Sequence, residues 1–249
     1  MSGHSKWASI KHKKAATDAR RGQLFTKLAR AITVAAREGG GDPEANFTLA
    51  AAIQKARDYS MPKDNIQRAI DRGSGGADGD ETIERVLYEG YGPGGVAILV
   101  ETLTDNRNRT GAEIRHAFDK HGGSLGEPGS VAWVFERRGV LLVDAGRYSE
   151  DDLIGAIDAG AQDVSVDGDS LKVVCGAEDL APVREALEST QVAIESAELT
   201  MEPKSVVEVG PADASSLIRL MDALDEHDDV EAVHANFDLP AELLEQAVA

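Results

Sequence analysis

The spacing of apolar residues changes after residue 75, and the change divides the chain into a helical part and a part in which strands and helices are mixed. Between residues 23 and 75, apolar residues recur every three or four positions, which is the period of an amphipathic helix. From residue 84 onward they alternate instead, as in ERVLYEGY (84–91) and VAILVETL (96–103), which is the period of a strand. A chain that carries the two periods in separate segments is predicted to fold as α+β.

Glycine and proline divide the first 75 residues into three predicted helices. The first helix ends at the glycine triplet 39–41. The second is predicted to begin with Asp42 as its N-cap and Pro43 as its first helical residue. The third begins at Pro62, and the three short helices predict a small bundle with one core. On the first helix, the basic residues that fall opposite the apolar stripe are Lys13, Arg20, Lys27, Arg30 and Arg37.

Residues 79–240 carry the elements of two α+β units, one inside the other. The segment 139–202 has the order strand, helix, strand, strand, helix, strand, which is that of a ferredoxin-like sandwich. The two segments that flank it, 79–137 and 205–240, each have part of the strands and helices of a sandwich, and together they are predicted to form a second one. The predicted fold class is therefore α+β, with an N-terminal three-helix domain plus two ferredoxin-like α+β domains, one inserted in the other. The predicted domains are 1–75, the discontinuous 79–137 with 205–240, and the inserted 138–203.

Three local patterns in this part predict where its elements begin. Thr110 and Glu113 have the spacing of a capping box, which predicts a helix that begins near Thr110. VAWVFE (131–136) and GVLLVD (139–144) are predicted as two strands. GYGPGG (90–95) matches G-x-G-x-x-G, but a dinucleotide site requires that the motif lead into a helix. Here it leads into a strand, so we interpret its glycines as a turn.

Charge is distributed unevenly along the chain, whose formal net charge is −18. Residues 1–75 hold 14 Lys and Arg against 7 Asp and Glu, a net of +7. Residues 76–249 hold the other 12 basic residues against 37 acidic ones, a net of −25. A basic end on an acidic body predicts a nucleic acid or another anionic partner at that end. The alternative is a solvated basic helix face that has no partner.

Cysteine content and hydropathy favour a cytoplasmic location. The chain has one cysteine, Cys175, so an internal disulfide is excluded and a reducing compartment fits. It ends the apolar run LKVVC, which indicates a buried structural thiol. No apolar run approaches the ~20 residues of a membrane helix, so no membrane partner is predicted. The basic start is also typical of a mitochondrial transit peptide, but here the basic run continues into a patterned helix.

The sequence lacks the motifs that mark catalysis or the binding of metals and cofactors. It has no Walker A loop, no C-x-x-C and no H-E-x-x-H. His4 and His12 are eight apart and His116 and His121 are five apart, so neither pair has the spacing of helical metal ligands. No carboxylate lies in a recognisable catalytic context. We therefore predict a non-enzyme with no cofactor, no metal and no small-molecule substrate.

The predicted nucleic-acid contacts lie in the first basic run and in the helix that follows it. Lysine and arginine neutralise phosphates and release counterions, which is a sequence-independent attraction. Two interpretations of Trp7 stay open, because its indole can stack on an unpaired base or pack on the helical bundle. The composition does not separate DNA from RNA. The predicted contact residues are Lys6, Trp7, Lys11, His12, Lys13, Lys14, Arg20, Arg21 and Lys27.

A second candidate site is the segment TDNRNRT (104–110). Arg107, Asn108 and Arg109 are predicted to lie in a turn before a helix N-terminus, where an anion is favoured. The alternative is a capping loop whose arginines pair with the surrounding acids.

The acidic remainder of the chain would be repelled by phosphate, so it is expected to face away from nucleic acid. It either engages basic protein surfaces, such as those of ribosomal proteins, or serves solubility.

Five long segments of this chain resemble the YebC/PmpR family. They are GHSKWASIKHKKAATDARRGQLFTKLAR, AIQKARDYSMPKDNIQRAI followed by RGSG, YEGYGPGGVA, LTDNRNRTGAEIRHAFDKHGGSLGE and GSVAWVF. They cover most of residues 1–136, whereas the later part resembles the family by its layout. The resemblance implies a cytoplasmic, three-domain protein without a cofactor, with a helical N-terminal domain and two α+β domains, one inserted in the other.

The resemblance also implies one of two functions, because the family includes transcriptional regulators and the mitochondrial translational activator of cytochrome oxidase. The first is DNA binding and transcriptional control through the basic N-terminal helical module. The alternative is a translation factor that binds the ribosome, with ribosomal RNA or tRNA as partner, and relieves stalling at sequences such as proline runs. Beyond Gln23 the basic face is poor in side chains that read bases, which argues against tight recognition of an operator sequence.

Overall fold

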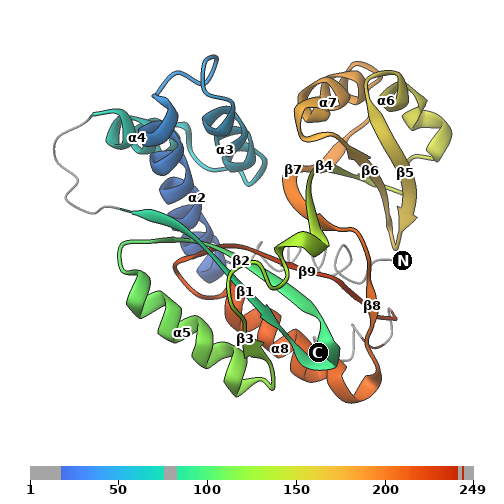
Figure 1. Ribbon diagram of the computed structural model, residues 1–249. Coiled ribbons are helices and arrows are strands. Elements are labelled where there is room, and N and C mark those ends of the chain that lie inside the picture. Colours follow the sequence, from blue (N-terminus) through green and yellow to red (C-terminus); the bar gives the residue numbers. More distant parts are fainter. Residues whose placement is uncertain (1–17, 76–82, 241–242, 244–249) are drawn as a thin grey trace.

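The computed structural model describes residues 18–75, 83–240 and 243 of the chain. These residues form three units (Figure 1). The helical unit consists of residues 18–75. The central unit is built on the sheet β3-β1-β2-β9, and the inserted unit on the sheet β5-β6-β4-β7, whose strands lie between β3 and β8 in the chain. Helix α2 runs from the other two helices of its unit down to the central sheet (Figure 1).

The helical unit is a bundle in which the first helix packs on the other two. Leu28 and Ile32 of α2 share a core with Leu49 and Ile53 of α3 and with Ile66 of α4. A Cβ at Gly73 would lie 2.3 Å from the carbonyl oxygen of Thr33, so glycine is what allows α4 to approach α2 closely. The three helices are α2 (Asp18–Gly39), α3 (Phe47–Asp58) and α4 (Lys63–Ser74).

The predicted start of the second helix was wrong. Asp42 and Pro43 lie in a turn, and α3 begins four residues later with Asn46 as its N-cap. The side chain of Asn46 accepts a hydrogen bond from the backbone N–H of Leu49 and donates to the carbonyl oxygens of Ala35 and Gly40. A buried asparagine that satisfies three backbone groups is a better cap than an exposed aspartate, because Asp42 caps only a turn through Glu44.

The central unit is a four-stranded antiparallel sheet with two helices on one face (Figure 1). Strand β2 is buried along both faces. Ile98 and Val100 contact Ile114 of α5 and Leu217 of α8 in the main core. Leu103 packs instead on α2, and Ala97 and Leu99 pack on the segment that leads to the inserted unit. The elements are β1 (Glu84–Tyr91), β2 (Ala97–Thr104), α5 (Arg107–Lys120), β3 (Ser124–Leu125), β8 (Val207–Glu208), α8 (Pro211–Asp225), β9 (Val230–Ala235) and β10 (Phe237–Asp238).

The inserted unit confirms the predicted ferredoxin-like order. Its strand order β5-β6-β4-β7, with every neighbouring pair antiparallel, is that of the split βαβ sandwich. Ser149 and Asp152 form a capping box, and Gly168 has the positive φ of a tight hairpin. The elements are β4 (Phe135–Asp144), a 3₁₀ turn (Glu150–Leu153), α6 (Ile154–Asp158), β5 (Ala161–Asp167), β6 (Ser170–Cys175), α7 (Leu180–Ser189) and β7 (Ile194–Pro203).

Two predicted boundaries in the α+β part were wrong. Residues 132–134 form a 3₁₀ turn, and β4 runs as one strand across what had been predicted as the gap between two strands. Helix α5 begins at Arg107 with Asn106 as its N-cap, three residues before Thr110. Thr110 is not a cap because its hydroxyl is buried and donates to Asp229. The division of the chain into domains at 137/138 and 203/205 stays a prediction.

Three simpler expectations can be compared with the structure directly. The G-x-G-x-x-G segment forms a turn that leads into β2, with Gly94 and Gly95 at positive φ. Cys175 is fully buried, and burial raises the pKa of its thiol to about 11. Among the described residues, no helix has both the length and the apolar character that a membrane crossing needs.

Candidate nucleic-acid interface

Most of the predicted nucleic-acid contacts fall in the first 21 residues. Those that lie outside the described residues are Lys6, Trp7, Lys11, His12, Lys13 and Lys14. For Arg20 and Arg21 the structure describes only the backbone, which belongs to the start of α2. Contact between these residues and nucleic acid therefore stays a prediction. The side chains that follow Arg21 on α2 are described. They show how α2 is held to the rest of the molecule directly after the basic segment, residues 6–21.

The first side chains of α2 that the structure describes bind the end of α8. Lys27 Nζ donates to the carbonyl oxygen of Asp225, 2.5 Å away, at the C-terminus of α8. Gln23 Nε2 donates to the carbonyl oxygen of Glu226 and to Asp228 Oδ1, at 2.7 and 2.9 Å. A cation at the C-terminus of a helix is favoured because it satisfies terminal carbonyls and faces the negative end of the helix dipole. The ammonium of Lys27, a predicted phosphate contact, is thus engaged within the molecule.

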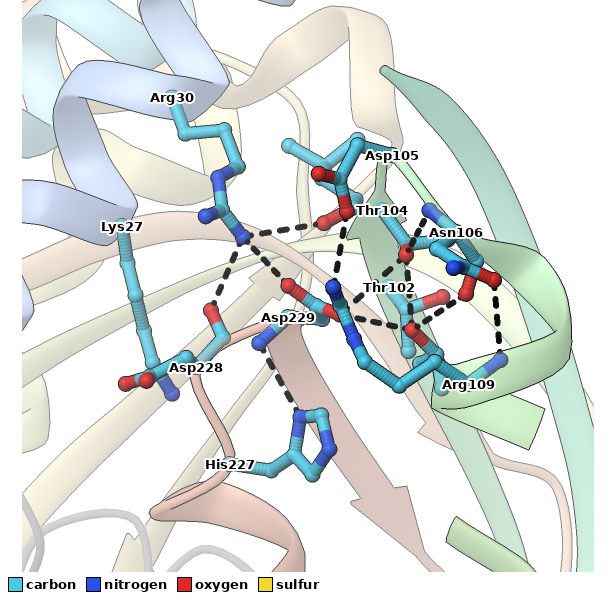
Figure 2. Close-up of polar contacts among 12 residues, drawn as sticks. Lys27, Arg30, Thr102, Thr104, Asp105, Asn106, Arg109, His227, Asp228 and Asp229 are labelled. Atoms are coloured by element: carbon cyan, nitrogen blue, oxygen red, sulfur yellow. Dashed lines mark hydrogen bonds and ion pairs between the residues drawn. The ribbon is translucent and has the colours of Figure 1, made fainter. Parts of the chain in front are cut away.

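One turn further along α2, Arg30 enters a polar cluster between the helical and central units (Figure 2). Its Nη1 donates to Asp229 Oδ1 at 2.9 Å and to the carbonyl oxygens of Leu103 and Asp228 at 3.1 and 3.2 Å. The basic face of α2, predicted opposite the apolar stripe, is therefore covered by the central unit at this point.

Asp229 is the acceptor at the centre of this cluster (Figure 2). Its side chain is 6% exposed. Arg30 binds one carboxylate oxygen, and the other accepts from Arg109 Nη2 at 2.8 Å, from Thr110 Oγ1 at 2.6 Å and from Thr104 Oγ1 at 3.2 Å. Burial by itself would raise the pKa of Asp229. The hydrogen bonds from Thr110, Arg109 and Arg30 outweigh burial and lower this pKa to about 2.

Arg109, one of the three predicted anion-binding residues, is an internal partner in this cluster. It bridges Asp229 and Asp105, with 2.8 Å from Nη2 to each carboxylate. Hydrogen bonds to Asp229 and Asp105 raise its pKa. Asn106 caps the helix by accepting from the N–H of Arg109. For Arg109 the geometry is that of the alternative interpretation, a capped helix start whose arginine pairs with acids.

Arg107 and Asn108 are exposed on the first turn of α5 and line a shallow cavity of about 480 Å³. The cavity lies over α5, β1 and β3. Its other lining residues are Tyr88, Gly111, Ala112, Arg115, His116, Asp119 and Leu125. The predicted anion site is therefore divided, because Arg109 turns inward to Asp229 whereas Arg107 and Asn108 line the cavity.

Sequence reasoning missed Asp229 and Arg115. Asp229 lies 199 residues from Arg30 in the chain, and no local pattern connects the two. Arg115 follows Arg107 by eight positions, so both lie on one face of a helix once that helix is known to begin at Arg107. This spacing was visible in the sequence and was obscured by the wrong start at Thr110.

Comparison with known proteins gives a family match to both parts of the chain. Residues 5–76 match the model described as "TACO1/YebC protein N-terminal domain", and residues 83–237 match "TACO1/YebC second and third domain". The first match includes the basic residues 6–21.

Full-length relatives and a solved structure are similar to this chain. A protein of Rubrobacter xylanophilus is 56% identical over 98% of both chains, and one of Dictyoglomus thermophilum is 51% identical over 98% of this chain and 99% of its own. Each is named "Probable transcriptional regulatory protein". The crystal structure of a conserved hypothetical protein of Aquifex aeolicus is 48% identical, covers 96% of this chain and 99% of its own, and has a TM-score of 0.85.

Proposed function

The chain belongs to the TACO1/YebC family, and from that premise we propose that it is a nucleic-acid-binding regulator of gene expression that binds duplex DNA through residues 6–21. Its relatives are named as regulatory proteins and not as enzymes. The binding is proposed to depend on phosphate contacts with little reading of bases.

The observation that carries this proposal is the concentration of cations at one end of the chain. Residues 6–21 hold six Lys and Arg against one acid, Asp18, whereas residues 76–249 carry a net charge of −25. Cations attract phosphate independently of sequence, and the net negative charge of the body repels it, so the basic end is the part best suited to contact the phosphates of duplex DNA.

The anchoring of α2 supports this assignment of roles. Lys27 and Arg30 are engaged with the loop 225–229 of the central unit, directly after the basic segment. Gln23 is held by the same loop. The part of α2 that follows residue 21 is thus fixed to the body of the protein, and we assign the phosphate contacts to the cations of residues 6–21.

A charge-matched pair of variants tests the proposal. One variant replaces five cations of the segment with glutamine: Lys11, Lys13, Lys14, Arg20 and Arg21. The control replaces five exposed cations elsewhere with glutamine: Arg57, Lys63, Arg72, Arg137 and Arg147. Affinity for duplex DNA is measured by fluorescence anisotropy over a range of salt concentrations.

The segment variant is expected to lose affinity by about two orders of magnitude or more and to show a slope of log K against log salt that is lower by about four. The control variant is expected to bind like the wild-type protein. If both variants keep the wild-type affinity and slope, the proposal is wrong.

A second candidate partner is RNA in the ribosome, and the −25 charge of residues 76–249 favours it specifically. An acidic body on a basic segment suits a surface on which RNA and basic proteins lie side by side. Crosslinking in cells, followed by sequencing of the bound nucleic acid, separates the two partners. Promoter DNA as the main product supports the first candidate, and ribosomal RNA or tRNA supports the second and contradicts the first.

A further inference from the structure

Four exposed cations of the acidic part of the chain that form no ion pair lie on two neighbouring helices, α5 and α8. Ion pairs engage Arg85, Arg109, Arg138, Lys172 and Arg184 with acids. In the part of the chain that the structure describes, no ion pair engages Arg107, Arg115 or Lys120 of α5, or Arg219 of α8. All four side chains are exposed. In a body with so many acids, an exposed group of unneutralised cations marks a surface suited to an anion.

Two of these arginines line the cavity on α5 described above. Its α5 residues lie at positions 107, 108, 111, 112, 115, 116 and 119, which is one face of the helix. Tyr88 of β1 also lines the cavity, and its hydroxyl donates to the carbonyl oxygen of Arg107 at 3.1 Å. A Cβ at Gly111 would lie 3.3 Å from the Tyr88 hydroxyl oxygen, so the phenol packs directly against the helix.

The charge around the cavity is positive although the surrounding unit is acidic. Arg107 and Arg115 face a single carboxylate, Asp119, among the described lining residues. The positive field extends along α5. Burial lowers the pKa of His121, and the nearby Lys120, Arg219 and His116 lower it further.

The chemistry of the lining favours one class of ligand. Guanidinium groups bind phosphate through paired N–H donors, and they do so better than a point charge. Tyr88 and Leu125 supply a ring and an apolar surface, against which a base or sugar can pack. The volume of about 480 Å³ is within the range of small-ligand sites, roughly 300–1,000 Å³.

We propose that this cavity binds a nucleoside phosphate, with Arg107 and Arg115 on its phosphate and with Tyr88 and Leu125 against its base or sugar. The ligand is either a free mononucleotide or one unit of a single strand. This site goes beyond the proposed function, because it lies on a different element from the basic segment and does not require that segment.

Direct binding to the full-length protein tests the proposal with two probes, AMP and a short single-stranded oligoribonucleotide. The Arg107→Glu/Arg115→Glu variant is expected to bind the occupying probe about tenfold more weakly or worse, because both phosphate partners are reversed in charge. The Arg137→Glu/Arg147→Glu control changes net charge equally at exposed positions outside the cavity. It is expected to bind within about twofold of wild type.

A second variant, Ala112→Phe, fills the cavity without removing a charge. Ala112 is exposed on α5, so the larger side chain is compatible with folding. This variant is expected to weaken binding as the arginine reversal does, whereas a diffuse electrostatic attraction would be unaffected.

The outcomes distinguish a free nucleotide from one unit of a strand as the ligand. They also distinguish failure of this proposal from failure of the duplex-DNA proposal. AMP binding that both cavity variants abolish supports a free nucleotide. Loss of oligoribonucleotide binding alone supports a unit within a strand. If neither cavity variant differs from the control with either probe, the inference is overturned. The glutamine variant of the basic segment is expected to keep AMP binding, so failure of the duplex-DNA proposal is distinguishable from failure of this one.

Discussion

The helical unit is attached to the body of the protein at two places that differ in physical character. At the first, Gln23 and Lys27 of α2 bind the loop 225–229 of the central unit. Arg30 of the same helix binds the carboxylate of Asp229 in that loop (Figure 2). At the second, Asp58 and Lys55 of α3 form ion pairs with Arg184 and Glu198 of the inserted unit.

Burial of the carboxylate is the main difference between the two attachments, because the arginines that bind Asp229 are themselves partly exposed, Arg30 at 28% and Arg109 at 45%. The Asp229 side chain is 6% exposed, and the two threonines that hydrogen-bond to it are buried. The carboxylates of the second attachment are more exposed to solvent. Arg184 and Asp58 are 21% and 18% exposed, and Lys55 and Glu198 are 35% and 37% exposed. Removing one partner of a buried charge cluster leaves the other charges uncompensated, whereas partly exposed pairs are screened by water and salt.

Geometry partly offsets the exposure of the second attachment. Arg184 binds Asp58 with two nitrogens, each 3.1 Å from a carboxylate oxygen. The negative charge of Glu198 raises the pKa of Lys55 above its usual range. Bidentate pairs give orientation as well as energy. The comparison therefore indicates that the first attachment belongs to the fold, whereas the second sets how the helical and inserted units are oriented.

The largest expected effect is that of removing the central carboxylate. Asp229→Ala removes the one buried carboxylate that accepts from Arg30, Arg109 and two buried hydroxyls, and it is expected to lower the free energy of unfolding by about 3 kcal/mol. Urea denaturation followed by circular dichroism measures this change. The neighbouring exposed Asp228 provides the control, and Asp228→Ala is expected to cost within about 0.5 kcal/mol. Equal effects of the two substitutions would contradict the assignment of Asp229 to the fold.

Lowering the pH is expected to reduce the stability of the fold by a smaller amount than Asp229→Ala does. Because the pKa of Asp229 is lowered to about 2, its charge stabilises the fold at pH values above its unfolded pKa of about 3.9. That contribution, about 2 kcal/mol, is lost as the pH falls from about 4 through 2.

The Asp229→Asn variant isolates this contribution. The difference in stability between it and the wild-type protein is expected to be constant above about pH 5 and to shrink toward pH 2. Glu89, whose pKa is also lowered, is unchanged in both proteins, so its contribution cancels. A difference that does not change with pH would show that the charge of Asp229 is not what stabilises the cluster.

The smallest effect on stability is expected at the second attachment. Asp58→Ala is expected to cost about 1 kcal/mol or less, and to change the distance between the helical and inserted units measured by small-angle scattering or fluorescence energy transfer. High salt is expected to change the distance between the helical and inserted units of the wild-type protein in the same direction, because salt screens these ion pairs. The control is Glu188→Ala, which removes the other, more exposed partner of Arg184. If Asp58→Ala leaves the distance as it is in the control, this attachment does not set the orientation.

Local sequence patterns predicted which helices and strands are present more accurately than they predicted the residues at which these elements begin. The three N-terminal helices, the order of the inserted unit and the turn at residues 90–95 all follow from periodicity and from glycine placement. The helix starts at Asp42 and Thr110 were wrong because each residue has the right chemistry for a cap but is used otherwise. Asn46 has a better set of backbone partners than Asp42, and Thr110 is buried against Asp229.

The candidate sites were also only partly predictable from the sequence. Composition indicated a basic end, but it did not indicate that Lys27 and Arg30 of that end are bound to the central unit. Arg107 and Arg109 are two residues apart, yet one lines a cavity and the other binds an internal aspartate. On a helix, residues two apart face in different directions, so the choice between them depends on what packs on each side.

The sequence by itself determined the α+β class, the position of the three helices and the polarity of charge along the chain, because periodicity and composition are local quantities. Only the tertiary structure decided which cations stay at the surface. Asp229 and Arg30 are 199 residues apart in the chain, and they meet because α2 packs on Leu103 of β2, next to the loop that leads into β9. A charge is neutralised by whatever lies within a few ångströms of it, and the fold, not the order of residues, brings the partner to that distance.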